Sequence, residues 1–167
     1  MPVPRAVSST CQSMVPGQGG RIMERNAITL LQYAGFLLVV GLASAFYSAA
    51  DRTVGWNPHG VSGLIACGGA AALIAVLGIL TGKGKSAAAW VGLALAFLLL
   101  SYGGMKTFQT LRSLADEGVK LASARGITQE AAERSLLYKA WIFGAMALFS
   151  LNAFMRLGMS LRSDKTA

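Results

Sequence analysis

The sequence predicts an all-α integral membrane protein with about four transmembrane helices, the third and fourth of which extend into a helical hairpin outside the membrane. Three observations support this fold class. Hydrophobic residues make up 54% of the 167 residues and charged residues only 13%, which is too little charge to cover the surface of a soluble domain of this size. Uncharged runs in the chain are long enough to cross a bilayer core of about 30 Å. The basic residues flank these runs and form no patch, as Lys and Arg do beside lipid headgroups.

Residues 1–26 differ in composition from the rest. They contain three prolines, and three arginines against the single acid Glu24. An Arg-rich, acid-poor composition is typical of an organelle transit peptide. However, no amphipathic helix that carries these arginines is visible. We therefore favour an irregular basic tail, ordered only by packing on another surface.

A single transmembrane domain is expected over residues 27–161, followed by a short tail at 162–167. The predicted spans are uncharged except the last, which is interrupted only by Arg156. That arginine lies close enough to the end of its span to reach the headgroups. The four spans are 27–50, 61–82, 86–105 and 140–161.

The connections predict how the spans follow one another. Residues 51–60 contain Gly55 and Pro58 and cannot continue a helix. The Gly-Lys-Gly-Lys turn within residues 81–85 is short, so the second and third spans should be antiparallel neighbours. An even number of spans places both termini on one side, and the Lys and Arg distribution weakly favours that side as the positive one.

Residues 106–139 are charged, yet apolar residues still recur at helical spacing. Gly126 is typical of a helix C-terminus, and Thr128 of an N-cap with Glu130 in the first turn. We therefore expect the third helix to run over residues 86–125 and the fourth over 129–161, as a hairpin that projects about 25–30 Å from the membrane. The apolar stripe comprises Phe108, Leu111, Ala115, Val119 and Ala122.

The sequence predicts no catalytic, cofactor or metal site. No Asp, Glu, Lys, Arg or His lies in the middle of a span, which argues against an ion or proton pathway within this chain. His59 is the only histidine and Cys67 follows eight residues later, whereas a stable metal site needs three or four ligands. We interpret His59 as an interfacial hydrogen-bonding residue and Cys67 as a small buried side chain that forms no disulfide with Cys11. Structural lipids are the only bound molecules expected.

Small residues four positions apart predict close helix packing, since they let backbones approach each other in lipid. Such faces can serve packing within the bundle or docking of a partner, and four short helices cannot use all of them internally. The predicted packing residues are Gly41, Ala45, Gly68, Ala72, Gly92 and Ala96. Tryptophans and basic residues near the span ends are expected at the membrane interface. These are Trp56, Trp90, Trp141, Lys83, Lys85 and Arg156.

Residues 64–105 read LIACGGAAALIAVLGILTGKGKSAAAWVGLALAFLLLSYGGM. This stretch, a Gly-rich span, a short Lys/Gly/Ser turn and a second Gly/Leu span, resembles the transmembrane protein fourteen family. These are small organelle membrane proteins linked to export of fatty acids or porphyrin. The family's later Lys-x-x-Pro-Ala-Gly element is missing here, and the charged hairpin has no counterpart in it. The resemblance covers about a quarter of the chain.

Together these features favour a non-catalytic accessory or structural subunit of a large organelle membrane complex, of the respiratory-complex or ATP synthase type. Its expected partners are other membrane subunits and lipids, not nucleic acid, because no basic stripe is present. The expected location is the mitochondrial inner membrane, with a plastid membrane as the alternative. The alternative function, implied by the resemblance, is a small transporter of lipid, fatty acid or porphyrin. An enzyme is not expected, because the usual site constellations are missing.

Overall fold

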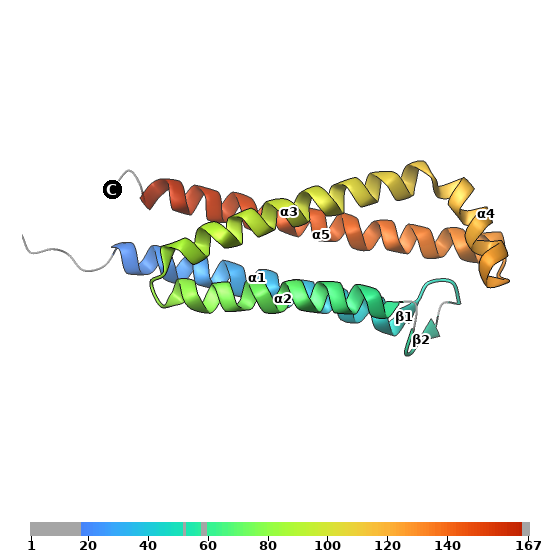
Figure 1. The fold of residues 1–167 in the computed structure, drawn as a ribbon, viewed down its shortest axis with the longest axis horizontal. Coiled ribbons are helices and arrows are strands. Elements are labelled where there is room, and N and C mark those ends of the chain that lie inside the picture. The colour runs from blue at the N-terminus through green and yellow to red at the C-terminus, as the bar shows by residue number, and fades with distance from the viewer. Residues whose placement is uncertain (1–17, 52, 58–59, 165–167) are drawn as a thin grey trace, which may run out of the picture.

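The computed structural model describes residues 18–51, 53–57 and 60–164, which are almost entirely helical (Figure 1). The all-α fold class is therefore confirmed. Four helices, all except α4, are long and apolar enough to cross a membrane. The helices are α1 (Gln18–Phe46), α2 (Val61–Gly82), α3 (Ser86–Arg112), α4 (Leu114–Arg125) and α5 (Gln129–Asp164). Two short strands, β1 (Tyr47–Ser48) and β2 (Thr53–Val54), pair antiparallel between α1 and α2.

Helix α1 begins at Gln18, so the prediction of an irregular tail is wrong for residues 18–26; residues 1–17 lie outside the described part of the chain. Burial explains the longer helix. Asn26 and Ala27 are buried against the bundle, and tertiary packing of one face is what stabilises most helices. Composition alone did not reveal this contact.

Helix α1 also ends earlier than expected, at Phe46 rather than at residue 50. The backbone N–H of Gly55 donates to the Phe46 carbonyl at 2.9 Å, and that of Asn57 donates to the Ala45 carbonyl at 2.7 Å. The returning loop thus satisfies carbonyls that a longer helix would have bonded itself. Residues 47–50 instead form β1 and the turn that follows it.

The turn between α2 and α3 closes by hydrogen bonds typical of a Schellman motif. The N–H of Lys85 donates to Leu80 at 3.1 Å and that of Gly84 to Thr81 at 2.9 Å, with Gly84 at φ 82°. Because this turn is tight, α2 and α3 are antiparallel and contact each other, as predicted. They then diverge along their length (Figure 1).

The third helix is not continuous to residue 125, contrary to the prediction. It ends at Arg112, and Ser113 separates it from α4. The Ser113 hydroxyl donates to the Gln109 carbonyl at 2.8 Å, a local bond that competes with the helical pattern and bends helices.

Two turn signals in this region are confirmed. Helix α4 stops at Gly126, which has φ 62°, and Thr128 Oγ1 accepts the N–H of Ala131 at 3.3 Å with Glu130 in the first turn of α5. Helix α4 packs on α5. At Gly118 a β-carbon would lie 3.0 Å from Glu133 Cγ, so the two helices approach each other closely there.

The bundle consists of two antiparallel pairs, α1 with α2 and α3 with α5, and contacts between α1 and α5 join them. Small residues mediate several of these contacts: a β-carbon at Gly103 of α3 would lie 3.0 Å from the Phe143 carbonyl of α5. The core includes Leu30, Tyr33, Ala34, Leu37, Ala71, Ile74, Ala96, Met146, Ala153 and Leu157.

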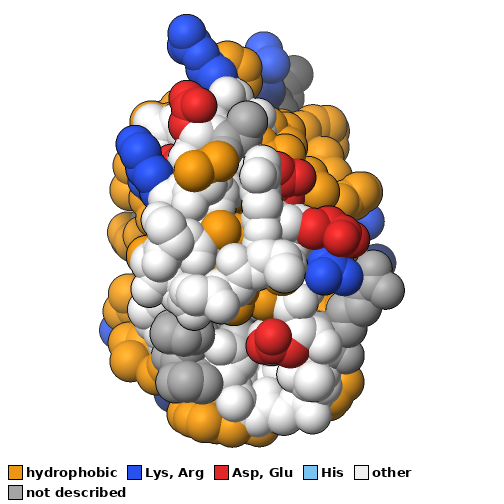
Figure 2. All heavy atoms as spheres, turned by 90° about the vertical axis from the view of Figure 1, so that its right-hand side faces the viewer, with side chains coloured by type: hydrophobic (Ala, Val, Ile, Leu, Met, Phe, Trp, Pro, Cys, Tyr) orange, Lys and Arg blue, Asp and Glu red, His pale blue; other side chains and the backbone are white. Residues whose placement is uncertain are grey.

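Charge is arranged in bands along the bundle. On α5 no charged residue lies between Lys139 and Arg156, a length of about 25 Å at the helical rise. Helix α1 begins and α5 ends at the same end of the bundle (Figure 1). The opposite end carries polar side chains and charges of both signs, with hydrophobic side chains along its margins (Figure 2). This distribution fits a band of lipid around the middle of the helices.

Candidate functional site

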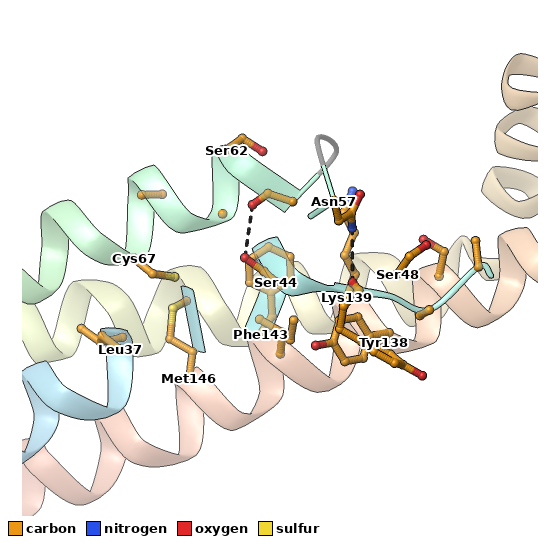
Figure 3. A pocket seen from close by; sticks show the side chains of 18 of the residues that line it. Leu37, Ser44, Ser48, Asn57, Ser62, Cys67, Tyr138, Lys139, Phe143 and Met146 are labelled. Atoms are coloured by element: carbon orange, nitrogen blue, oxygen red, sulfur yellow. Dashed lines mark hydrogen bonds between the residues drawn. The ribbon is translucent and has the colours of Figure 1, made fainter. Parts of the chain in front are cut away.

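A cavity of about 520 Å³ opens between α2 and the α3–α5 pair, toward the end that carries the β-hairpin (Figure 3). Its volume lies within the range of small-molecule sites. Every helix contributes to its walls. Its lining includes Leu37, Ser44, Tyr47, Ser48, Asp51, Asn57, Gly60, Gly63, Cys67, Ala70, Leu99, Arg125, Tyr138, Lys139, Phe143 and Met146.

The deep end of the cavity is apolar. Leu37, Cys67 and Met146 lie there in Figure 3, away from the β-hairpin, and Ala70 and Leu99 complete this part of the lining. Leu37 and Met146 belong to the core of the bundle. Cys67 is free and half-buried. An alkyl or ring system therefore suits this end chemically.

The mouth of the cavity is polar, and its aromatic side chains are fixed in position. Tyr138 donates its hydroxyl hydrogen to the Ala43 carbonyl at 3.2 Å, and its ring contacts that of Tyr47 edge to face at 4.9 Å. Asn57 Nδ2 donates to the Tyr47 carbonyl at 3.2 Å. These contacts tie α5, β1 and the loop before α2 into one rim.

Three charged side chains lie at this mouth: Arg125, Lys139 and Asp51. Two positive charges and one negative charge leave a net charge of +1. The Asp51 carboxylate already accepts a hydrogen bond from the Ser48 hydroxyl at 2.9 Å. The rim is thus better suited to an anionic or hydrogen-bond-accepting headgroup than to a cationic one.

The wall formed by α1 and α2 depends on glycines. A β-carbon at Gly60 would lie 1.7 Å from the Ser44 carbonyl oxygen, and one at Gly63 would lie 2.6 Å from Ser44 Oγ. Ser44 donates to the Gly41 carbonyl at 2.8 Å and approaches that of Gly60 at 3.2 Å. The end of α1 and the start of α2 are consequently in backbone contact beside the cavity.

The predicted packing residues fall into two groups. Ala45 and Ala96 are fully buried, Gly41 faces Cys67, and a β-carbon at Gly92 would lie 2.7 Å from Leu30 Cδ2. The second group, Gly68 and Ala72, has a different position. Gly68 has no neighbouring atom within 4 Å of a β-carbon position, and Ala72 is exposed on the outer face of α2.

The residues predicted at the membrane interface are all exposed. Lys83 and Lys85 occupy the α2–α3 turn, with Trp90 shortly after it in α3. Trp56 lies near the opposite end, after β2. Trp141, 76% exposed, follows Lys139 on α5, and Arg156 lies toward the end of the same helix.

Sequence reasoning missed the cavity, because its walls come from segments more than a hundred residues apart, from Leu37 to Met146. Gly60 and Gly63 were missed as packing residues although they repeat at short spacing before and within α2.

His59 lies outside the described residues. Among the residues that the structure describes, no group of three His, Cys, Asp or Glu side chains could hold a metal ion.

The fold and the cavity define the class of protein. It is a helical protein with four helices able to span a membrane, which indicates a membrane location, and it has a cavity between its helices. The sequence matches no protein-family model, and comparison with curated proteins and with solved structures also found no match.

Proposed function

We propose that this protein binds an amphiphile, a lipid or fatty acid with a carboxylate or phosphate headgroup, in the cavity between α2 and the α3–α5 pair. The single observation that carries the proposal is the polarity of the cavity: apolar around Cys67 and Met146, polar and cationic around Lys139. An amphiphile has the same two-part chemistry. Small-molecule sites likewise combine an apolar lining with a few placed polar groups.

The polar rim should decide selectivity. A chain that enters from the bilayer gains no hydrophobic free energy, since lipid tails are as apolar as the cavity wall. Binding would therefore depend on hydrogen bonds and charge at the mouth, where Arg125, Lys139 and Tyr138 lie. The resemblance of residues 64–105 to a family linked to fatty acid and porphyrin export agrees with this ligand class, and movement of the ligand across the membrane would be the corresponding activity.

The thiol of Cys67 offers a direct test. In a Cys11→Ser background it is the only thiol in the chain, so its modification by a water-soluble thiol reagent reports access to the deep end of the cavity. We expect dodecanoate to slow this modification and dodecyl maltoside, with the same chain and a neutral headgroup, to slow it much less. Equal protection by both would reject a selective anionic site.

A matched pair of substitutions tests the location. Ala70→Phe places a large ring in the cavity, whereas Ala72→Phe places the same ring on the exposed outer face of α2. Ala70→Phe should abolish the protection by dodecanoate and Ala72→Phe should preserve it. If Ala70→Phe leaves protection intact, the ligand does not occupy this cavity.

A second candidate function is an accessory, non-catalytic subunit of a larger membrane assembly. The observation that favours it is the outer face of α2, the least buried of the four candidate spans. Gly68 and Gly69 have open space at their β-carbon positions there, and Ala72 is exposed. Small residues that face away from the described helices of this chain suit close approach of a partner helix.

In this second role the partners would be other membrane subunits, in a respiratory or ATP synthase complex of the mitochondrial inner membrane or in a plastid membrane. Helix α4 and the turns of α5 that precede Lys139 would form the contact outside the lipid. Gly68→Leu should shift the protein from a large to a small species on a native gel of solubilised membranes. Gly35→Leu on α1 is the control, since it too has open space. An unchanged gel for Gly68→Leu would reject this face as the docking surface.

A further inference from the structure

A second groove lies between α1 and α5, at the end of the bundle where α1 begins. Its volume is about 360 Å³. Three guanidinium groups, those of Arg21, Arg25 and Arg156, line it together with a single acid, Glu24. Three positive charges against one negative charge leave a net charge of +2.

Helical geometry brings these groups together. Residues three and four positions apart lie on one face of a helix, which places Arg21 and Arg25 above Thr29 and Gln32 along α1. Arg156 reaches the same groove from α5, more than 120 residues later in the chain. Thr29 already donates its hydroxyl hydrogen to the Arg25 carbonyl at 3.0 Å, so the guanidinium groups and the Gln32 amide are the donors that remain for a ligand.

The contact between α1 and α5 continues from the groove toward the middle of the bundle, and we call this contact the seam. Deeper in the bundle the seam becomes apolar. Phe36 follows Gln32 by one turn on α1, and Phe149 precedes Arg156 by two turns on α5. Their rings stack at a centroid distance of 3.6 Å and an interplanar angle of 11°. From the end of the bundle toward its middle, the seam therefore changes from cationic to polar to aromatic, in the order in which a phospholipid presents its phosphate, glycerol esters and acyl chains.

We propose that this groove binds the phosphate of an anionic phospholipid, with Arg21, Arg25 and Arg156 around the phosphate and an acyl chain along the Phe36–Phe149 seam. Guanidinium groups bind phosphate oxygens in a bidentate, geometrically specific way. Basic pockets between transmembrane helices are a known kind of headgroup site. The proposal is independent of the amphiphile cavity, which lies toward the other end of the bundle.

The test measures which lipids stay bound to the full-length protein. The protein is extracted from vesicles of equal parts phosphatidylglycerol and phosphatidylcholine, and the retained lipids are counted by native mass spectrometry. The double variant Arg25→Gln/Arg156→Gln should lower the ratio of retained phosphatidylglycerol to phosphatidylcholine by about 25-fold, at about fivefold per basic residue near the surface. Lys83→Gln/Lys85→Gln, which removes the same charge at the same end of the bundle, should change this ratio far less, because neither lysine lines the groove.

The charge-preserving variant Arg25→Lys/Arg156→Lys keeps the test informative if the glutamine variant fails to fold. It should lose part of the preference, because lysine retains the charge but not the bidentate geometry. An equal loss in the Lys83/Lys85 variant would overturn the proposal in favour of general surface attraction. Displacement of the lipid by inorganic phosphate, but not by chloride at the same ionic strength, would assign the groove to a soluble anion and overturn the lipid assignment.

Discussion

The hydroxyl of Tyr33 on α1 is hydrogen-bonded to the hydroxyl of Ser150 on α5, and both side chains are buried. Ser150 also donates its hydrogen to the Met146 carbonyl at 2.7 Å. Because a serine hydroxyl has one hydrogen, Tyr33 must be the donor to Ser150. This bond joins the α1–α2 pair to the α3–α5 pair in the middle of the bundle, where α5 carries no charged residue between Lys139 and Arg156.

Ser150→Ala should destabilise the protein more than Tyr33→Phe does. Removal of Ser150 leaves the Tyr33 hydroxyl buried without its acceptor, which we expect to cost about 1–2 kcal/mol, whereas Tyr33→Phe leaves Ser150 bonded to Met146 and should cost about 0.5–1 kcal/mol. The double variant should be more stable than Ser150→Ala alone. The measurement is the free energy of unfolding in detergent, with the exposed Ser101→Ala as the control. Strictly additive effects would contradict the hydrogen bond itself, and a loss for Tyr33→Phe as large as that for Ser150→Ala would contradict the donor assignment.

Gly60→Ala should be among the most destabilising single-methyl substitutions in the chain. Its β-carbon would lie 1.7 Å from the Ser44 carbonyl oxygen, and since that atom is backbone, the end of α1 must move. We expect a loss of more than about 2 kcal/mol in the free energy of unfolding. Gly35→Ala is the matched control in open space within α1 and should be neutral or stabilising by up to about 1 kcal/mol. A neutral Gly60→Ala would mean that α1 and α2 do not meet there.

Gly92→Leu and Gly68→Leu should differ in a way that separates internal packing from docking. Gly92 lies against Leu30 in the core, so a leucine there should unfold or loosen the isolated protein, at a cost of about 1–3 kcal/mol or more. Gly68 faces open space, so Gly68→Leu should leave the thermal stability of the purified protein unchanged. Thermal unfolding in detergent measures both variants. Equal destabilisation would place Gly68 in the interior.

Gly126→Ala should lower the free energy of unfolding by about 1 kcal/mol, because Gly126 ends α4 with φ 62°, a conformation that a β-carbon penalises. Gly126→Asn should recover part of this loss, since asparagine tolerates the left-handed region better. Gly104→Ala is the control, with open space and no positive φ. The outcome that contradicts this prediction is equal stability of the alanine and asparagine variants.

The two termini should be accessible from the same side of the membrane, because α1 begins and α5 ends at one end of the bundle. Single cysteines introduced at Lys83 and Lys85 should react from that side as well, and one introduced at Glu117 should react from the other. Labelling of sealed vesicles with a membrane-impermeant thiol reagent, in a background that lacks Cys11 and Cys67, measures this. Reaction of the two termini from opposite sides would reject four spans.

Much of the fold follows from local properties of the sequence. The lengths of the uncharged runs predict the four long helices, since lipid requires each spanning segment to satisfy its own backbone hydrogen bonds. Gly126 and Thr128 predict where α4 ends and α5 begins, because a left-handed stop and a side-chain cap act within one helical turn. For the same reason the tight turn before α3 correctly predicts antiparallel neighbours.

The sequence by itself determined that the chain forms long apolar helices and where most of them turn, since run length and turn chemistry act over a few residues. Only the tertiary structure decided the extension of α1 back to Gln18, the bond from Tyr33 to Ser150, and the cavity that brings Cys67 near Met146. It also decided that Arg25 and Arg156 share a groove. Each of these depends on how two helices rotate and approach one another, and that is set by the summed packing of many side chains across the bundle, with no local pattern to reveal it.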